Sequence, residues 1–208
     1  ENRHIPYGPY ERWFKRPFDI CCGLAAILVF WWLYLLVALL VRIKLGSPVI
    51  FCQERPGKDE KIFKLYKFRT MTDARDADGE LLPDEVRLTK FGRLLRSTSL
   101  DELPELWNIL KGDMSVVGPR PERPVFVEQF EKEIENYDYR FEVKAGLTSL
   151  SHVYGRYSTY IHDRTYYDLF YIMHYSLLLD FKIILLTTKT MFLKSAADNS
   201  PSNKPLSS

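Results

Sequence analysis

The sequence has few of the residues that build metal centres or disulfide frameworks. Its three cysteines, Cys21, Cys22 and Cys52, form no C-x-x-C pair, which excludes a disulfide framework and favours a reducing compartment. The four histidines lack the H-E-x-x-H spacing of zinc hydrolases, and no cysteine–histidine zinc set occurs. Phosphate loops of the G-x-x-x-x-G-K-[S/T] and G-x-G-x-x-G types are missing as well. A nucleotide would therefore not be held in a standard glycine cradle.

An excess of one charge is also lacking. The chain has 29 lysines and arginines against 27 aspartates and glutamates, a formal net charge of +2, so bulk charge does not indicate a nucleic-acid-binding protein. With 46% hydrophobic residues and only 10 glycines and 12 prolines, it is not a disordered or fibrous chain. Its 208 residues suffice for one domain of ordinary size with its own core.

What the sequence does contain is an uncharged apolar run over residues 20–41. As a continuous helix this run would be about 33 Å long, enough to cross the hydrocarbon core of a bilayer. Basic residues flank both of its ends: Arg12, Lys15 and Arg16 before it, Arg42 and Lys44 after it. A single span carries its basic excess on one side only, so this pattern favours a re-entrant hairpin that enters one leaflet and returns. A spanning helix and the buried helix of a soluble protein remain alternatives.

The rest of the chain reads as a mixture of helices with a little strand. Residues 1–15 are polar and aromatic, which predicts an arm at a membrane interface. Two β-rich runs at 49–53 and 61–69, separated by a turn at 55–59, predict a β-hairpin. Helical patterns follow at 90–96, 101–111, 124–136, 164–175 and 177–194. The last is amphipathic and fits either a core or a membrane interface, and residues 195–208 read as a disordered tail.

The most informative polar stretch is STSLDELPE at residues 97–105. Ser99 and Glu102 have the spacing of a capping box, while Pro104 in the first turn makes Asp101 a competing N-cap. Either register puts Asp101 and Glu102 at the positive end of a helix, which favours ionised carboxylates and attracts phosphates. Capping alone is the common role of such residues and remains open.

Two basic features accompany this acidic stretch. Arg120 lies between two prolines that fix its backbone, which lowers the entropy lost when its guanidinium binds a phosphate; a solvated arginine in a stiff loop is the alternative. Lys67 and Arg96 belong to a basic and aromatic cluster whose other members are Lys64, Tyr66, Phe68, Arg69 and Arg93. Such a cluster can bind single-stranded nucleic acid, but beside an apolar run it is expected to face lipid phosphates or an anionic substrate.

Together these motifs resemble the bacterial sugar transferase family, the monotopic phosphoglycosyl transferases that start surface-polysaccharide and glycoconjugate assembly. The resemblance covers about residues 15–185, and its densest parts are FCQERPGKDEKIFKLYKFRTM at 51–71 and SLDELPELWNILKGDMSVVGPRP at 99–121. It implies a mostly helical α+β fold: a membrane-embedded monotopic domain with an N-terminal re-entrant helical hairpin, a small β-hairpin and interfacial amphipathic helices. The expected division is an interfacial arm at 1–15, the hairpin at 16–45, the catalytic domain at 46–194 and the tail at 195–208.

The resemblance also implies a reaction: transfer of a sugar 1-phosphate from a UDP-sugar to undecaprenyl phosphate, with release of UMP, through a phospho-aspartyl intermediate. Asp101 matches the nucleophile and Glu102 the partner carboxylate that manages protons or the metal. Such covalent catalysis divides one transfer between two bulky anions into two steps. The family's Mg²⁺ would neutralise developing charge, with Asp101 and Asp180 as its expected ligands. The residues that match phosphate or nucleotide contacts are Lys67, Arg96, Arg120 and Arg156, whereas Glu105 receives no role.

The resemblance further implies the bacterial inner (cytoplasmic) membrane, with the catalytic domain facing the cytoplasm. Membrane lipid is an expected partner, nucleic acid is not, and a homodimer is allowed for. Two departures stand out. The Ser-Pro pair that the family often carries in mid-hairpin falls here at Trp31-Trp32, which leaves open what bends the helix. The family's RPGITGxAQVNGR loop has changed at residues 144–156, so the sequence does not identify the sugar.

Two rival functions remain. A metal-dependent glycosyltransferase would use Asp76 and Asp78 to hold a divalent cation and would release UDP, although a solvated turn is favoured in so polar a loop. A non-catalytic scaffold of the same pathway would dock on anionic lipid through the basic and aromatic cluster and would turn over no nucleotide.

Overall fold

A computed structural model describes residues 8–154 and 161–198. Its longest element is the helix α1 (Lys15–Leu45), which follows a short π-helical turn, η1 (Tyr10–Phe14). By length and composition α1 is the one helix among the described residues that could cross a membrane, with a mean hydropathy of 2.7 in its most apolar window. Only 11% of that window is buried. The apolar run forms a single continuous helix, and the re-entrant helical hairpin expected at 16–45 stays a prediction.

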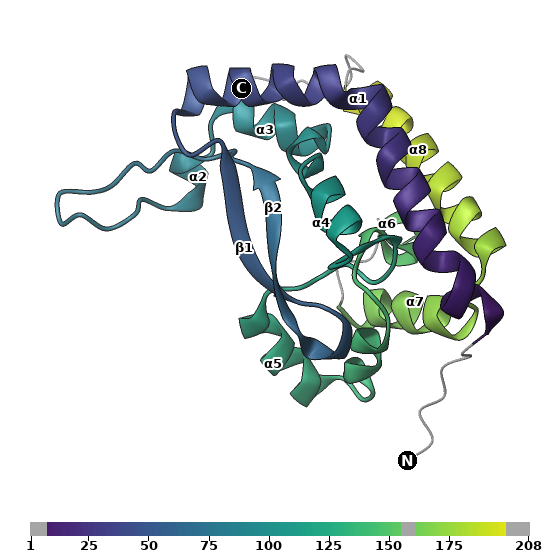
Figure 1. Ribbon diagram of the computed structural model, residues 1–208. Helices are drawn as coiled ribbons and strands as arrows, with labels where there is room; N and C mark the ends of the chain where they lie inside the picture. Colours follow the sequence, from purple (N-terminus) through teal and green to yellow (C-terminus); the bar gives the residue numbers. More distant parts are fainter. Residues whose placement is uncertain (1–7, 155–160, 199–208) are drawn as a thin grey trace.

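The helix α1 bends sharply along its length, as Figure 1 shows. Residues 28–32 are all exposed, with Leu28 at 75% and Trp31 at 58% of their full exposure. Five successive exposed positions exceed one helical turn, so α1 loses contact with the domain there. Gly23 before this stretch and Val37 after it are buried. No proline lies between residues 18 and 47, and the bend instead follows the packing of the two halves on different parts of the domain.

The first half of α1 packs on the middle of the domain. The Asp19 carboxylate accepts hydrogen bonds from the Ser115 hydroxyl at 2.9 Å and the Val116 amide at 3.0 Å. Gly23 faces α4 (Glu105–Lys111) so closely that a Cβ there would lie 3.2 Å from the Leu110 side chain. The second half packs elsewhere: Val37, Val41 and Leu45 form a core cluster with Phe68 and Leu95.

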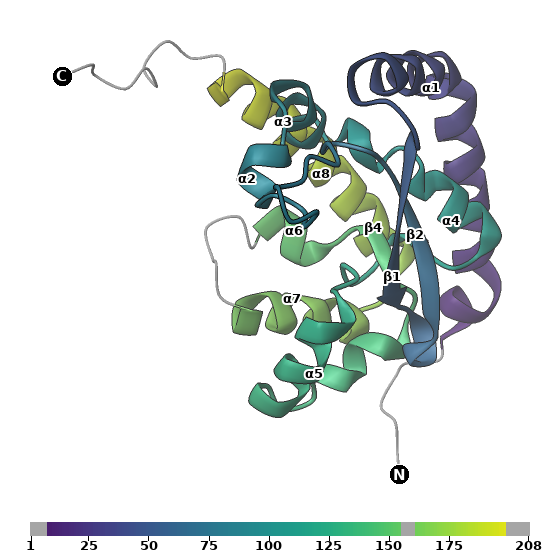
Figure 2. The same cartoon turned by 90° about the vertical axis from the view of Figure 1, so that its left-hand side faces the viewer.

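The predicted β-hairpin is confirmed. Strands β1 (Ile50–Pro56) and β2 (Ile62–Phe68) pair antiparallel, with Ile50 opposite Phe68, and the short η2 (Lys58–Glu60) lies in their connection. The first strand extends through Pro56, so the turn begins later than the sequence predicted. In Figure 2, α4 lies between β2 and α1, which fits the packing of Leu65 against Leu106 and Ile109.

Helix occurs in all five regions where it was predicted, with different bounds. The helices are α2 (Asp84–Arg87), α3 (Lys90–Ser97), α4, α5 (Pro124–Glu133), α6 (Leu150–Tyr154), α7 (Ile161–Met173) and α8 (Leu177–Asp198), with 3₁₀ segments η3 (Leu100–Glu102) and η4 (Tyr137–Glu142). The predicted helix 101–111 is divided between η3 and α4. Because α8 continues to Asp198, residues 195–198 are helical and do not belong to a disordered tail; residues 199–208 lie outside the described part.

A second, two-stranded sheet was not predicted. Strands β3 (Ser115–Val117) and β4 (Gly146–Thr148) pair in parallel, and three residues each are too few for a recognisable pattern. Their backbones approach closely, since a Cβ on Gly146 would lie 2.1 Å from the Gly118 nitrogen. The chain leaves the carboxyl ends of these strands toward Arg120 and toward α6, so both segments start from the same edge.

Candidate active site

Three carboxylates come together where α3 gives way to α4. Asp101 and Glu102 lie on η3, and Glu105 opens α4. The chain turns into η3 at Ser99, whose φ of 56° is left-handed, and neither Ser99 nor Pro104 caps a helix through its side chain. Ser99 precedes η3 without a side-chain cap, and α4 begins after Pro104 and not after Asp101, so neither predicted capping register forms; the 3₁₀ turn separates Asp101 and Glu102 from α4.

Lys67 and Arg120 hold two of these carboxylates. The Lys67 Nζ, projecting from β2, lies 2.8 Å from Glu102 Oε1 and 3.1 Å from Glu105 Oε1. Arg120, just after β3, forms a hydrogen-bonded ion pair with the same Glu102 oxygen. The structure thus brings together Lys67, Glu102 and Arg120, which the resemblance assigns to one site, and it adds Glu105, which sequence reasoning left without a role.

Asp101 differs from its two neighbours. It is only 8% exposed, and it forms no ion pair with any residue that the structure describes. Burial and the charge of Glu102 raise the pKa of Asp101, while Lys67 and Arg96 oppose that shift. Asp101 is therefore a buried carboxylate that has basic residues nearby but forms no ion pair with them.

The other two carboxyl groups have opposite electrostatics. Burial alone would raise the pKa of Glu102, but Arg120 and Lys67 outweigh it and lower that pKa to about 2. Burial and the Glu102 charge raise the pKa of Glu105 to about 7. The ion pair with Lys67, which Glu105 shares with Glu102, lowers this pKa but does not outweigh them. Near neutral pH, Glu102 is ionised and Glu105 is close to half-protonated.

The loop that carries Arg120 is fixed by two other arginines. Arg55 of β1 donates from Nη1 to the Pro121 carbonyl at 2.9 Å, and Arg140 donates from Nη2 to the Arg120 carbonyl at 2.8 Å. Arg140 is buried and also donates from Nε to Asp168 of α7 at 2.9 Å. Nothing in the sequence pattern singled out Arg55, Arg140 or Asp168, because their partners are distant in the chain.

The remaining predicted contacts have different outcomes. Arg96 of α3 donates from Nε to the Thr70 hydroxyl at 3.1 Å, and its charge acts on Asp101. Arg156 lies outside the described residues. The loop with Asp76 and Asp78 is a turn in which Asp76 accepts the amide hydrogens of Asp78 and Glu80 at 3.0 and 2.9 Å, as the solvated-turn interpretation expects.

Asp180 lies apart from the three carboxylates. Its side chain is fully buried, and it accepts hydrogen bonds from Lys15 at 2.5 Å, Tyr10 at 2.6 Å and Tyr171 at 2.7 Å. Within the described ranges no three acidic, histidine or cysteine side chains cluster as a metal site. Asp180 ties the start of α8 to the start of α1 through Lys15, and its pairing with Asp101 as metal ligands stays a prediction.

The comparisons with known proteins agree with this architecture. The model of the bacterial sugar transferase family matches residues 10–194, and the chain belongs to that family. It is 45% identical over 179 residues to the uncharacterized sugar transferase EpsL of Bacillus subtilis strain 168, covering 86% of this chain and 87% of EpsL.

Two longer relatives carry names that describe a reaction. The UDP-glucose:undecaprenyl-phosphate glucose-1-phosphate transferase of Klebsiella pneumoniae is 41% identical over 191 residues, 88% of this chain and 41% of that protein. The UDP-N-acetylgalactosamine-undecaprenyl-phosphate N-acetylgalactosaminephosphotransferase of Aeromonas hydrophila is 37% identical over 189 residues, 88% of this chain and 45% of that protein. The chain thus spans less than half the length of these two relatives.

Proposed function

We propose that this chain is a phosphoglycosyl transferase that moves a sugar 1-phosphate from a UDP-sugar to undecaprenyl phosphate and releases UMP. The names of the longer relatives support the donor and acceptor classes. The observation that carries the proposal is the buried Asp101 carboxylate, which forms no ion pair among the described residues, beside two cations that a second carboxylate holds in place. Such a group is free to attack an electrophile between fixed positive charges.

The chemistry has two steps. An oxygen of ionised Asp101 attacks the phosphorus that bears the sugar, the bond from that phosphorus to the bridging diphosphate oxygen breaks, and UMP leaves with that oxygen. A phosphate oxygen of undecaprenyl phosphate then attacks the same phosphorus and releases the Asp101 carboxylate. Burial raises the pKa of Asp101 and so makes its ionised form more basic, which favours it as a nucleophile.

The cations around Asp101 stabilise the charge that moves during transfer. Lys67 and Arg120 are held by Glu102, and Arg96 acts on Asp101 from α3. Fixed charges that need no rearrangement are what a phosphoryl transfer site requires. In this proposal Glu102 positions cations, because a carboxylate with a pKa of about 2 is a poor proton acceptor.

The residues present could hold a magnesium ion through Asp101. Mg²⁺ is usually held by one or two carboxylates together with substrate phosphates. Glu102 and Glu105 are engaged by Lys67 and Arg120, so Asp101, which has no ion pair among the described residues, is the acidic group that would hold the ion with the diphosphate. When bound, Mg²⁺ would neutralise phosphate charge.

The same proposal places α1 in the cytoplasmic membrane as a re-entrant helix, with the domain on the cytoplasmic side. The support is that one domain contacts both halves: Asp19 bonds to Ser115, and Val41 packs with Leu95. A straight span would carry one of these contacts across the bilayer. The exposed residues 28–32 would then enter deepest.

The test is nucleotide release by the purified full chain with Mg²⁺, undecaprenyl phosphate and a panel of UDP-sugars. We expect UMP from at least one sugar, and a phosphosugar adduct on Asp101 by mass spectrometry when the acceptor is withheld. Asp101→Asn should abolish both signals, while the exposed change Asp76→Asn should leave both within threefold of wild type. Release of UDP, or an adduct on another residue, would contradict the proposal.

A further inference from the structure

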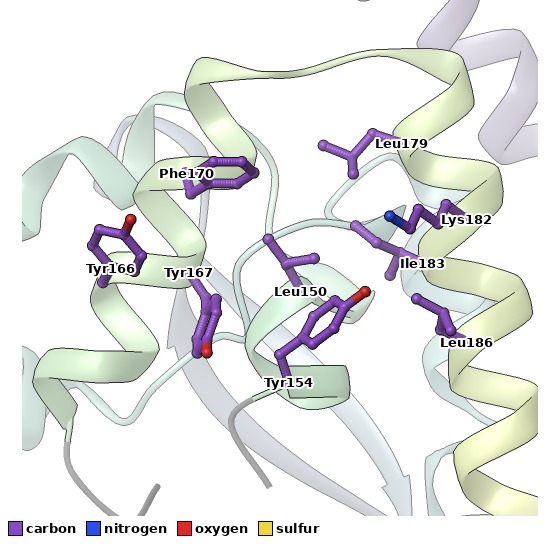
Figure 3. A pocket seen from close by; sticks show the side chains of 9 residues that line it. All are labelled: Leu150, Tyr154, Tyr166, Tyr167, Phe170, Leu179, Lys182, Ile183 and Leu186. Carbon is purple, nitrogen blue, oxygen red and sulfur yellow. The ribbon is translucent and has the colours of Figure 1, made fainter.

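A pocket of about 250 Å³ lies between α6, α7 and α8, outside the candidate active site (Figure 3). Its floor is aliphatic and buried, with Leu150 at 6% and Ile183 at 0% exposure. Its rim is aromatic and exposed, formed by Tyr154, Tyr166 and Phe170. An apolar floor below an aromatic rim is the arrangement that proteins present at the boundary between hydrocarbon and headgroups.

One charged side chain belongs to this pocket. Lys182 of α8 points its amino group toward the space enclosed by α6 and α7 (Figure 3). It has no ion-pair partner among the residues that the structure describes. Lys182 is exposed, so its ammonium is accessible to an anion at the pocket mouth, which would form a charge-assisted hydrogen bond with it.

The exposed surface of α8 leads toward the pocket. Leu178, Phe181 and Leu185 are exposed at 83%, 53% and 63%, and their spacing puts them on one face of the helix. Lys182 follows Leu178 by four residues and precedes Leu185 by three, so it borders this face as well as the pocket. A molecule lying on the apolar face of α8 thus meets the ammonium before it reaches the floor.

The size and the mostly apolar lining do not favour a whole nucleotide sugar. Pockets that enclose a small-molecule ligand usually measure about 300–1,000 Å³ and offer several polar groups. This pocket is smaller, and Lys182 is the one cation among its lining residues. It is suited to part of a ligand, such as a hydrocarbon chain whose anionic end stays at the mouth.

We propose that this pocket holds one acyl chain of an anionic membrane phospholipid, with the headgroup phosphate on Lys182. Polyprenyl phosphate shares this chemistry, but its phosphate has to reach Asp101, where Lys67, Arg96 and Arg120 supply the positive charge. Lys182 does not contact these groups, so a phosphate on Lys182 is not placed for transfer. The bound lipid is a structural lipid and not a reactant.

Lipid retention tests this proposal without using turnover, so its result is independent of the proposed function. The purified full chain would be incubated in detergent with equal concentrations of phosphatidylglycerol, phosphatidylcholine and undecaprenyl phosphate, and its adducts counted by native mass spectrometry. We expect one retained phosphatidylglycerol, and about fivefold lower occupancy in Lys182→Gln. Lys189→Gln, a matched charge change two turns along α8 and outside the lining, should retain it as the wild type does.

A second pair of variants tests the floor. Leu186→Trp adds bulk inside the pocket and should displace the lipid, whereas Leu185→Trp, on the exposed face, should not. Retention by Lys182→Gln and Leu186→Trp equal to wild type would overturn the proposal. The proposal would also be overturned if the wild type retained phosphatidylcholine as well as it retains phosphatidylglycerol. It would be overturned too if the two variants lost bound undecaprenyl phosphate while phosphatidylglycerol stayed bound.

Discussion

The guanidinium of Arg120 forms an ion pair with the same Glu102 oxygen that lies 2.8 Å from the Lys67 ammonium. One carboxylate thus fixes two cations, one from strand β2 and one from the loop that follows β3. Because these cations lower the pKa of Glu102 to about 2, it stays ionised wherever the protein is folded and working. Glu102 therefore has an electrostatic positioning role beside Asp101.

Glu102→Gln tests this role. The amide keeps the size of the side chain but removes its charge, so Lys67 and Arg120 lose the group that positions them. We expect UMP release to fall about 100-fold, the usual effect of disturbing a preorganised charge. Initial rates at saturating substrate measure it, with the exposed change Glu80→Gln as control. A rate within threefold of wild type would show that the ion pairs are not needed for transfer.

Glu105 gives the fold a predicted pH dependence. Burial and the Glu102 charge raise its pKa from 4.5 to about 7. Between these two values the unfolded chain releases the proton that the folded chain keeps, so Glu105 costs stability as the pH rises through that window. Glu105→Gln has no proton to lose and keeps an oxygen for Lys67. From pH 5 to pH 7.5 we expect the variant to gain about 2 kcal/mol on the wild type.

Urea unfolding in detergent at several pH values measures this difference. Glu128→Gln, an exposed change on α5, should follow the wild type at every pH. If the gap between Glu105→Gln and wild type stays constant over this range, Glu105 does not titrate as its environment predicts.

The sequence predicted the long apolar helix, but the flanking charges had a different role from the one expected. The basic residues before the apolar run suggested a flank that lies against headgroups, but Lys15 is buried on Asp180 and Arg16 donates to the Ile109 and Leu110 carbonyls at 2.6 and 2.7 Å. Both side chains hold the domain onto α1. Charge counting cannot separate a cation that meets lipid from one that caps α4, because the difference is tertiary.

The candidate active site was predictable to the extent that it is local. Asp101 and Glu102 stood out as adjacent carboxylates, and Arg120 between prolines stood out as a fixed cation. Glu105 was missed because its contact with Lys67 depends on β2, which is distant from Glu105 in the sequence. The parallel pairing of β3 with β4, which positions Arg120, has no periodic signal in three-residue strands.

Asp180 is predicted to support the fold and not the metal. Lys15→Met would leave the buried Asp180 carboxylate without a cation, and we expect a loss of about 3–5 kcal/mol in unfolding free energy. Asp180→Asn should lower stability but leave unchanged the Mg²⁺ concentration that gives half-maximal UMP release. Thermal unfolding and a Mg²⁺ titration measure the two effects. A marked rise in the Mg²⁺ requirement of Asp180→Asn would return Asp180 to the metal site.

The bend of α1 predicts that both its ends lie on the same side of the membrane. In a chain whose native cysteines are replaced by serine, Arg12→Cys and Lys44→Cys place single exposed thiols near the two ends of the helix, and Trp31→Cys places one in the exposed stretch. In spheroplasts an impermeant maleimide should label neither end, and in inside-out vesicles it should label both. Trp31→Cys should resist the reagent in both preparations, because hydrocarbon excludes it. Labelling of the two ends from opposite sides would mean that α1 crosses the bilayer, and then Asp19 and Val41 could not both contact one domain as they do here.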